Sequence, residues 1–483
     1  MSESVGFAFP ALLPTLSFAP TPIAAHNSGM GARQWAEQIC EKLRHAGYQA
    51  LFTGGCVRDL LRKRNPVDYD VATDAHPGEV QRLFPGSIVV GAQFGVVIVI
   101  EDGLQVEVAT FRSDLGYADG RHPAAVKFSA TPEEDARRRD FTINGLMMDP
   151  RDGRVVDFVG GQADLAAGIV RAIGDPDLRF DEDKLRLVRG VRFAARFGYV
   201  IEAATRAAIV KRAPEILQVS QERLRDELTK MLTEGAARRA FELLDETGLL
   251  RELLPEISSM KGVAQPPQFH PEGDVWIHTL LMLGQLPAGC SPTLAWGVLL
   301  HDVGKPPTFK PPAGPNDRIR FDEHVELGTR MAEEICRRLR FSNDDIEQIS
   351  LLVANHLRFK DVAQMRTSTL KRFVRLPRFE EHLELHRLDC LSSHRDLTCY
   401  DFTQRFLQDT PPEAVRPVRL VSGEDLKEIG YKPGPAFKEI LRAVEDAQLE
   451  GKVQTREQAL ELVRSAFPAC NIPPRGGQAS AGR

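Results

Sequence analysis

The hydrophobic pattern of this 483-residue chain changes near Asp181, and this change most constrains the fold. Before it, a helical pattern from about Gln34 to Ala46 precedes short strand-like runs at 50–53, 87–90, 96–100 and 104–110. The dipeptide Asp102-Gly103 between the last two runs is typical of a β-hairpin turn. After Asp181, helical periodicity continues to the C-terminus. The pattern predicts an α+β fold in which a small mixed-sheet head is followed by all-α domains.

Breaks in the pattern near residues 160, 265 and 405 divide the chain further. At about 150 residues per domain, the length alone suggests roughly three domains. The predicted units are a flexible N-terminal arm (1–33), a head (34–160), a helical neck (161–265), a histidine-rich domain (266–405), a helical tail (406–470) and a disordered C-terminus (471–483).

The composition restricts where the protein works and how it could bind nucleic acid, but it does not identify a binding partner. The formal net charge of −5 gives no bulk basic excess, so any nucleic-acid site must be a local patch. Seven scattered cysteines with no Cys-x-x-Cys pair indicate a reducing compartment, and we expect a cytoplasmic protein. No apolar run approaches the roughly 18 residues of a membrane span. We therefore expect no membrane association, and the sequence indicates no obligate protein partner.

A glycine turn and a pair of aspartates suggest chemistry in the head. Gly54 and Gly55 follow a strand-like run and open a helical one, where backbone N–H groups can approach a phosphate. An ordinary tight turn explains two glycines equally well. Asp68 and Asp70 would point to one face of a strand, and two carboxylates so close call for a cation such as Mg²⁺. A solvated edge strand is the alternative.

These segments resemble the polymerase-β-type nucleotidyltransferases, specifically the bacterial tRNA CCA-adding and poly(A) polymerase class. The resemblance covers roughly residues 35–265 and rests on five motifs in the order of that family, which is more specific than any motif alone. The motifs are residues 54–59 with Asp68-x-Asp70, residues 138–145, residues 157–161 with Asp164-Leu165, Glu182-Asp183-x-x-Arg186 with Arg189 and Arg192, and residues 221–223 with Glu227-Leu228.

The resemblance implies a mechanism of phosphoryl transfer from CTP or ATP to an RNA 3′ end. Mg²⁺ on Asp68 and Asp70 would activate the RNA hydroxyl and clamp the α-phosphate while pyrophosphate leaves. Other residues in the matched motifs would bind the nucleotide: Gly55 and Arg58 the triphosphate, Arg139 and Asp140 the ribose. Glu107, on the strand-like run 104–110, is a candidate third carboxylate, although a charged residue on a half-exposed strand is equally common.

The fourth motif implies base selection by protein groups. If Asp183 and Arg186 lie on one helix, three residues apart, they share a face and present an acceptor beside a planar donor fork. Such a pair can hydrogen-bond the Watson–Crick edges of cytosine and adenine. Arg189 and Arg192 extend the same stripe toward triphosphate or RNA backbone. A solvated ladder of salt bridges is the alternative, since most helical Asp/Glu–Arg pairs are of that kind.

Eight of the 12 histidines fall between His270 and His394, which indicates a metal site. The chelating pair His301-Asp302 follows an apolar run and precedes Gly304-Lys305-Pro306. Imidazole and carboxylate together suit Mn, Fe, Co, Ni or Zn. A single histidine would more often be an ordinary structural residue. The other candidate ligands in the stretch are His278, His324, His356 and Asp389.

This stretch resembles the HD superfamily of metal-dependent phosphohydrolases, whose core is His…His-Asp…Asp. The resemblance implies that a first divalent transition metal binds His278, His301, Asp302 and Asp389, and that His324 and His356 complete a second site. Asp396 competes with Asp389 for the role of the last ligand. Lys305 could neutralise a phosphate. The substrate would be a phosphoester, such as a 2′,3′-cyclic phosphate or a 2′-phosphate at an RNA end.

Three interpretations remain open from sequence. The first is a tRNA nucleotidyltransferase that builds or repairs the 3′-terminal CCA with CTP and ATP, with an appended HD phosphohydrolase; its partner is the tRNA 3′ end. The second is a poly(A) polymerase or A-adding enzyme, which shares the same motifs. The third is an HD phosphohydrolase whose head only binds nucleotides, although the intact Asp68-x-Asp70 pair argues against a relic.

Overall fold

The computed structural model describes residues 31–90, 95–117, 123–128, 131–314 and 317–468. The predicted C-terminal segment 471–483, and the predicted arm up to residue 30, lie outside these ranges. The chain forms two compact units, Met1–Ala166 and Ala167–Arg483. Among the described residues, no helix is both long enough and apolar enough to cross a membrane.

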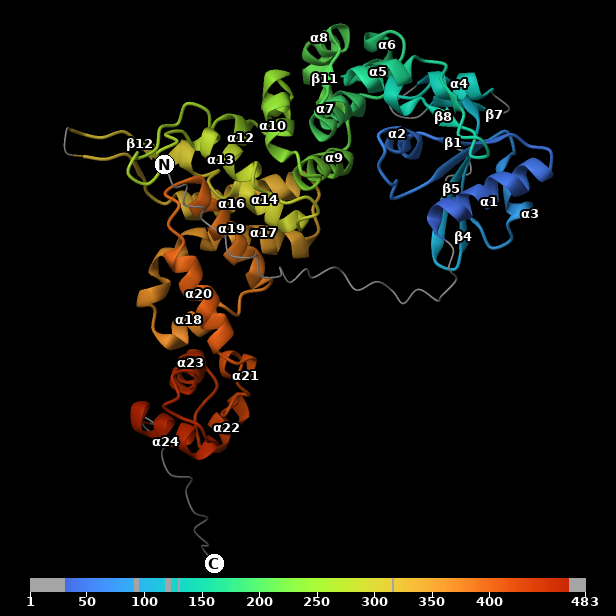
Figure 1. Cartoon of the computed structure of the whole chain (residues 1–483). Coiled ribbons are helices and arrows are strands. Elements are labelled where there is room, and N and C mark those ends of the chain that lie inside the picture. Colours follow the sequence, from blue (N-terminus) through green and yellow to red (C-terminus); the bar gives the residue numbers. More distant parts are fainter. Residues whose placement is uncertain (1–30, 91–94, 118–122, 129–130, 315–316, 469–483) are drawn as a thin grey trace, which may run out of the picture. The chain divides into compact units, whose positions relative to one another are not determined.

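A seven-stranded mixed sheet organises the first unit (Figure 1). Its strand order is β3-β4-β5-β2-β1-β8-β9, and only the β2–β5 pair is parallel. The strands are β1 (Ala50–Thr53), β2 (Asp70–Thr73), β3 (Ile88–Val90), β4 (Val96–Glu101), β5 (Leu104–Thr110), β8 (Met147–Met148) and β9 (Val155–Val156). The other elements are α1 (Ala32–His45), α2 (Gly55–Leu61), α3 (Pro77–Leu83), β6 (Arg112–Tyr117), β7 (Pro123–Phe128), α4 (Pro132–Arg137) and the 3-10 turn η2 (Thr142–Asn144).

The amphipathic helix α1 supplies much of the core of this unit. Trp35, Ile39 and Leu43 recur at helical spacing on its buried face and pack with Phe52 of β1 and Val108 of β5. The strand runs predicted from the sequence match the observed strands to within one residue at each end. This agreement follows because each run alternates or concentrates apolar residues over at least three positions.

The second unit begins with a helical neck. Its helix α7 carries buried residues on most of its surface, and it packs against α9 and α10. The neck elements are α5 (Gly161–Ala167, which spans the boundary), β10 (Ile169–Val170), α6 (Pro176–Glu182), α7 (Leu185–Phe197), β11 (Val200–Ile201), α8 (Ala203–Arg212), η3 (Ala213–Gln218), α9 (Gln221–Thr233), α10 (Ala237–Glu246), α11 (Leu249–Leu253) and α12 (Pro255–Ser258).

Helix α14 is the centre of the next domain. Residues 293–300 are all buried, as expected of a helix that is apolar on every side. It packs against α9, α13, α17 and α19, and a Cβ on Gly297 would lie only 2.7 Å from Leu352 of α17. The elements are α13 (Val275–Leu283), α14 (Pro292–Leu300), α15 (Lys305–Thr308), β12 (Phe309–Lys310), β13 (Arg320–Phe321), α16 (His324–Arg338), α17 (Asn343–Asn355), η4 (His356–Gln364), α18 (Thr367–Phe373) and α19 (Phe379–Ser392).

A smaller module with its own apolar core ends the described chain. Leu426, Ile440, Val444 and Val463 form the centre of that core. Arg372 and Arg375 of the preceding domain pair with Glu445 on its longest helix. The final helices are α20 (Thr398–Asp409), α21 (Pro412–Val415), α22 (Gly423–Glu428), α23 (Pro435–Leu449) and α24 (Arg456–Ala466).

The α+β fold class predicted from sequence is confirmed, with one difference. The neck and the histidine-rich domain are not purely helical, because β10 pairs with β11 and β12 pairs with β13. Each of these strands is two residues long, and alternation over two residues leaves no periodic signal in a sequence.

A buried ion pair in the neck gives a stability prediction. Arg192 and Glu227 have side chains only 6% and 4% exposed, and Arg192 Nε donates to Glu227 at 2.6 Å. Glu227→Ala would leave the guanidinium buried with less compensation, so we expect the free energy of unfolding to fall by about 3–5 kcal/mol. Denaturant unfolding of the whole chain measures this. Glu222→Ala, exposed on the same helix, should change stability by less than about 0.5 kcal/mol; equal effects would contradict the assignment.

Candidate active sites

The parallel pairing of β2 and β5 brings two carboxylates together in the head. Asp70, the first residue of β2, lies opposite Glu107 of β5. Burial raises the pKa of Asp70 to about 6; the charges of Glu107 and Asp68 add to that rise and Arg139 opposes it. Asp70, with two further carboxylates close enough to raise its pKa, offers the oxygen donors that Mg²⁺ prefers. Glu107, which the sequence left open, therefore belongs to this cluster.

The strand predicted to carry both aspartates is shorter than expected. It begins at Asp70, so Asp68 lies on the preceding segment and is exposed, while Tyr69 between them is buried. The two carboxylates still interact, since Asp68 contributes to the raised pKa of Asp70. Only Asp70 lies on the strand itself, and whether both carboxylates share one face stays a prediction.

Gly54 keeps the approach to these carboxylates open. Its φ of 69° is one that L side chains rarely adopt, and a Cβ there would lie 2.9 Å from Arg139 Nη1 and 4.0 Å from Asp70 Oδ2. Arg139 is held by Asp135, with Nη2 3.0 Å from Oδ2. The glycine turn thus leaves a space with a cation on one side and a carboxylate on the other, suited to a metal-bound phosphate.

Arg58 and Asp140 belong to a buried hydrogen-bond network next to this glycine turn. Arg58 is only 5% exposed; it donates to Asn144 Oδ1 at 2.6 Å and pairs with Asp59. Asn144 in turn donates to Asp140 Oδ1 at 2.9 Å. The Arg58 guanidinium also lies next to Gly55, because a Cβ added to Gly55 would be 3.6 Å from Arg58 Nη2. A direct contact of Arg58 or Asp140 with nucleotide stays a prediction, because the observed bonds place both in a buried network.

The predicted shared helix face of Asp183 and Arg186 is wrong. Asp183 has extended backbone angles (φ −152°, ψ 106°) and ends α6, whereas α7 begins only at Leu185. Asp183 instead accepts two hydrogen bonds from Arg223 of α9, and Arg186 pairs with Glu182. The break has a local cause, because the Asp183 carboxylate accepts the backbone N–H of Leu185 as a cap does.

The next two arginines on α7 face a shared acidic partner. Arg189 lies 3.6 Å from Glu227, and Arg192 bonds both Glu227 and Glu234. Arg189 keeps a side chain 30% exposed, but Arg192 is buried. In this structure Arg192 braces α7 against α9, and its role in nucleotide binding stays a prediction that requires this pairing to open.

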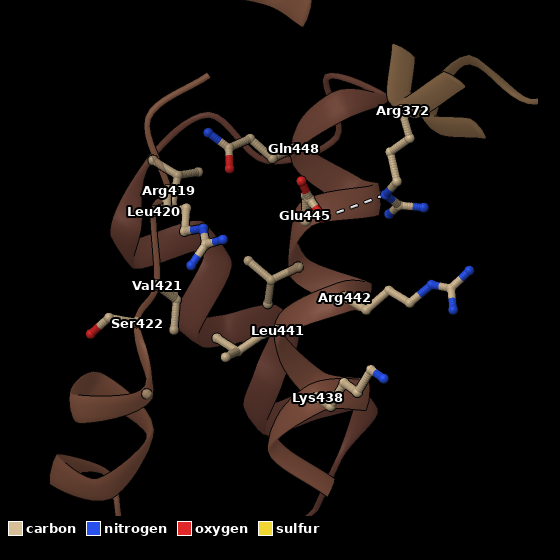
Figure 2. Close-up of a pocket in the computed structure, with 12 residues that line it drawn as sticks. Arg372, Arg419, Leu420, Val421, Ser422, Lys438, Leu441, Arg442, Glu445 and Gln448 are labelled. Atoms are coloured by element: carbon tan, nitrogen blue, oxygen red, sulfur yellow. Dashed lines mark hydrogen bonds and ion pairs between the residues drawn. The ribbon is translucent and has the colours of Figure 1, made fainter. Parts of the chain in front are cut away.

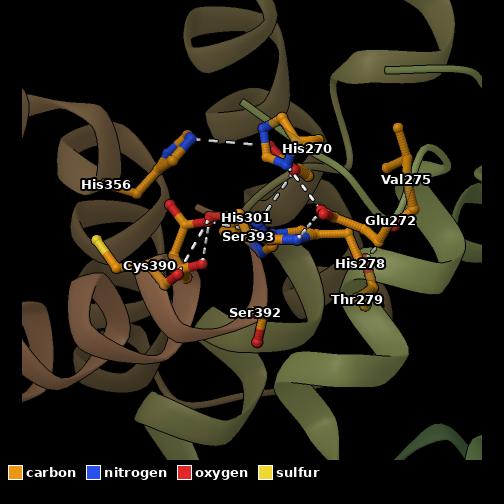
Figure 3. Close-up of polar contacts among 12 residues, drawn as sticks. His270, Glu272, Val275, His278, Thr279, His301, His356, Cys390, Ser392 and Ser393 are labelled. Atoms are coloured by element: carbon orange, nitrogen blue, oxygen red, sulfur yellow. Dashed lines mark hydrogen bonds and ion pairs between the residues drawn. The ribbon is translucent and has the colours of Figure 1, made fainter. Parts of the chain in front are cut away.

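The second candidate site lies where several helix ends of the histidine-rich domain meet (Figure 3). Helix α14 ends at His301, so its buried length carries His301-Asp302 into the interior. Close packing of Gly304 brings the start of α16 beside them, because a Cβ there would lie 2.1 Å from the carbonyl oxygen of His324. The six predicted ligands come from α13 (His278), the end of α14 (His301, Asp302), the start of α16 (His324), the end of α17 (His356) and α19 (Asp389).

Backbone carbonyls orient three of these histidines. The Nδ1 atoms of His301, His324 and His356 lie 2.9, 2.7 and 2.7 Å from the carbonyl oxygens of residues three positions earlier. Nδ1 is therefore the donor, and Nε2 is the ring nitrogen left to face a metal ion. The Nε2 atoms of His324 and His356 have no hydrogen-bond partner among the described residues. Such orientation of a lone pair by a second-layer hydrogen bond is typical of metal-binding histidines.

The ligand atoms fall into two groups that could each hold a metal ion. One comprises His278, His301 and Asp389; the other comprises Asp302, His324 and His356. Asp302 was expected with the first set, but its oxygens lie between the sets, 3.1 Å from His301 Nε2 and 3.8 Å from His356 Nε2. This position suits a carboxylate shared by two metals.

The structure also separates the two candidates for the last ligand. Asp389 Oδ1 lies 3.2 Å from His278 Nε2, inside the cluster. Asp396 is exposed and caps its own turn by accepting hydrogen bonds from Thr398. Asp389 is therefore the residue that the geometry places at the site.

Burial and charge set the protonation states of the cluster. Burial works against ionisation of Asp302, but the charges of His301 and Lys305 hold its pKa well below the usual range. Burial lowers the pKa of His356 to about 4, so its imidazole is neutral. Burial also disfavours the charged form of His278, but hydrogen bonds to Asp389 and Glu272 outweigh it and raise the pKa to about 9. An acidic, histidine-rich cluster of this kind fits a divalent transition metal.

Sequence analysis did not name two residues of ligand type that lie beside the cluster. The structure also changes the expectation that Lys305 is available to a phosphate. His270 and Glu272 form a third ligand-type group with His278. Their only sequence signal was a position within the histidine-rich stretch. Lys305 is buried, 2.7 Å from Asp302, and donates to Gln265 at 2.6 Å, so its ammonium is already occupied.

The tail carries a basic pocket of about 440 Å³ between residues 419–423 and α23 (Figure 2). Arg419, Lys438 and Arg442 line it and are exposed. Arg372 reaches Glu445 at its upper end. These exposed cations form a local basic patch on a chain that is acidic overall, beside apolar residues and Glu445 in the same lining.

The first unit is thus a head of the nucleotidyltransferase type, with carboxylates at paired strands beside a glycine turn, and the second unit carries an HD-type cluster. Family models agree with this division. The poly A polymerase head domain matches residues 50–171, the probable RNA and SrmB-binding site of polymerase A matches 198–261, and the HD domain matches 277–390. The chain is thus similar to poly A polymerases in its head and neck, and to HD domains further along.

Several curated relatives and solved structures that are similar to this chain are CCA-adding enzymes. The CCA-adding enzyme of Geobacillus sp. (strain WCH70) is 44% identical over 216 residues, 45% of this chain and 53% of the relative. That of Bacillus licheniformis is 38% identical over 256 residues, 52% of this chain and 64% of the relative. The chain therefore matches roughly half to two thirds of the length of these relatives.

Structural similarity extends further along the chain. The Bacillus stearothermophilus CCA-adding enzyme in complex with CTP is 26% identical, with a TM-score of 0.68 over 91% of this chain and 100% of that chain. The Thermotoga maritima CCA-adding enzyme complexed with tRNA, 20% identical with a TM-score of 0.54, shares the fold.

The raised pKa of Asp70 gives a pH prediction for the metal-free protein. Because its native pKa, about 6, exceeds the ordinary value of 3.8, ionised Asp70 destabilises the native state increasingly between about pH 4 and pH 6, and fully above that range. Asp70→Asn should therefore raise the free energy of unfolding by up to about 3 kcal/mol near pH 7.5 in chelator, and change little near pH 4.

Thermal unfolding at both pH values, with and without Mg²⁺, measures this. Mg²⁺ should stabilise the parent chain and not the Asp70→Asn variant. Glu41→Gln, on the exposed side of α1, serves as the matched control and should leave both unfolding curves unchanged. A variant that is stabilised equally at both pH values would contradict the prediction.

Proposed function

We propose that the chain is a tRNA nucleotidyltransferase that adds or repairs the 3′-terminal CCA with CTP and ATP and without a nucleic-acid template. The observation that carries the proposal is the cluster of Asp68, Asp70 and Glu107 beside Arg139 and under the open turn at Gly54. The similarity to CCA-adding enzymes, one of them in complex with CTP, supports it. We place this activity in the cytoplasm, in line with six described cysteines that are all free.

In this proposal the head carries out the transfer. Asp68 and Asp70 would hold Mg²⁺, which would supply activation of the RNA 3′-hydroxyl and charge neutralisation at the α-phosphate. Glu107 completes the carboxylate set. Arg139 presents a cation across the glycine turn, where it contacts the nucleotide, and Asp140 and Arg58 keep that turn rigid through Asn144.

The neck selects the base. Asp183 offers an acceptor and Arg186 a donor fork, each held by its own partner, Arg223 and Glu182. Since the two groups are not paired with each other, each can be oriented independently toward a Watson–Crick edge. Arg189, partly exposed on α7, is the candidate contact for phosphate or RNA backbone, ahead of Arg192.

The HD cluster hydrolyses a phosphoester at an RNA end, either a 2′,3′-cyclic phosphate or a phosphomonoester. His278, His301 and Asp389 would hold one divalent transition metal, and Asp302, His324 and His356 a second. At these residues a divalent metal would supply activation of water and neutralisation of phosphate charge. The chain's own contribution is to keep each Nε2 lone pair aimed inward through backbone carbonyls.

The two activities should separate by mutation. Asp70→Ala removes a metal ligand of the head, so nucleotide addition to tRNA lacking its 3′ end should fall by orders of magnitude, with phosphoester hydrolysis unchanged. Asp302→Ala removes a ligand of the HD cluster, so phosphoester hydrolysis should fall by orders of magnitude, with nucleotide addition unchanged. Incorporation of labelled CTP and ATP in Mg²⁺, and cleavage of a 2′,3′-cyclic nucleotide in Mn²⁺ or Ni²⁺, measure the two reactions.

The products of the same assay distinguish the competing functions. Addition of C, C and A in sequence supports the proposal. Addition of A alone, or of repeated A, would instead identify an A-adding enzyme or poly(A) polymerase of the same family. Hydrolysis without any incorporation would identify an HD phosphohydrolase with a nucleotide-binding head.

A further inference from the structure

The segment 264–274, here called the clamp loop, lies between the RNA-binding model, which ends at residue 261, and the HD model, which begins at 277. It is a closed loop. Ala264 and Asp274 form a bridge, and Gln265 N–H donates to the Gly273 carbonyl at 3.0 Å. The Asp274 side chain accepts N–H groups from Gly262 and Ile277, which ties the loop to the start of α13. Neither family model therefore assigns a role to its residues.

One side of the clamp loop holds His278 (Figure 3). Glu272 Oε1 lies 2.7 Å from His278 Nδ1 and 2.8 Å from His270 Nδ1, and the Glu272 side chain is only 6% exposed. His278 differs from His301, His324 and His356, whose Nδ1 atoms are held by the backbone carbonyls of residues three positions earlier. In the middle of α13 that carbonyl is engaged by the helix, so the acceptor must come from outside it.

The other side of the same loop holds Asp302 through Lys305. Gln265 Oε1 accepts from Lys305 Nζ at 2.6 Å, and Lys305 Nζ lies 2.7 Å from Asp302 Oδ2. Gln265 and Lys305 are both buried, at 1% and 6% exposure. The loop therefore reaches one residue in each of the two metal-type groups.

We propose that the clamp loop is a positioning element of the HD centre, in which Glu272 fixes the tautomer and orientation of His278 and Gln265 fixes Asp302 through Lys305. Glu272 Oε1, 2.7 Å from Nδ1, is the acceptor that we assign to the Nδ1 hydrogen, which would direct Nε2 toward the site of His301 and Asp389. Glu272 would thus orient His278, within α13, as backbone carbonyls orient the histidines at the helix ends. The inference rests on the proposed metal site of the HD domain.

Metal affinity of the full chain tests this. All variants are built on Asp68→Asn/Asp70→Asn, so that the head carboxylates do not contribute, and Mn²⁺ binding is measured by calorimetry. Glu272→Ala should weaken binding by about 10–100-fold with unchanged stoichiometry. Glu272→Gln retains an amide oxygen that accepts the Nδ1 hydrogen, so it should recover most of the affinity. Gln265→Ala should weaken binding in the same direction.

Controls separate this inference from the proposed function. Glu334→Ala, exposed on α16, should bind Mn²⁺ as the parent does. If the parent protein bound no Mn²⁺, or if Asp302→Ala bound it as tightly as the parent, the proposed HD site itself would be refuted. Normal affinity in Glu272→Ala would refute the positioning role alone. Loss of one whole equivalent of Mn²⁺ in both Glu272 variants would also overturn it, because Glu272 would then be a ligand. Thermal unfolding in chelator confirms that the variants are folded.

Discussion

Carboxylates placed close to one another, and therefore in need of positive charge, are the constraint on which both candidate sites depend. In the head, the parallel pairing of β2 and β5 forces Asp70 against Glu107, and Arg139 compensates only part of that charge. In the HD domain, Asp302 is buried and relies on His301 and Lys305. Neither arrangement improves stability by itself, since burying charge costs more than such pairs usually return. Both arrangements are explained by a cation that completes them.

The fold supplies this geometry with its most rigid parts. The head cluster lies on central strands of the sheet, and the HD cluster lies where α14, buried along nearly its whole length, ends beside the starts and ends of its neighbours. Sites built from packed strands and helix ends hold ligand atoms more closely than loops do. The clamp loop is the exception, and it is closed by its own hydrogen bonds.

Sequence predicted those features that depend on local pattern. Four strands of the head, β1, β3, β4 and β5, were predicted from short apolar runs, because such runs are a local property. The histidines and carboxylates of the HD cluster were recognised as candidates by their types and spacing, and their ligand roles came from the family resemblance. The expectation for Asp183 failed because its backbone is extended, so that α6 ends before it and α7 begins after it as a separate helix. The conflict between Asp389 and Asp396 could not be resolved from spacing, since both lie within one turn or two of the end of α19.

The sequence by itself determined the α+β class, the order of the units, the carboxylate pair of the head and the histidines of the second site. Only the tertiary structure decided which groups meet. It brought Glu107 beside Asp70 through strand pairing, placed Asp302 between two metal-type groups, and turned Glu272 toward His278. The reason is physical: residue type and periodicity are set along the chain, whereas pairing, burial and the direction of a lone pair depend on contacts between segments far apart in it.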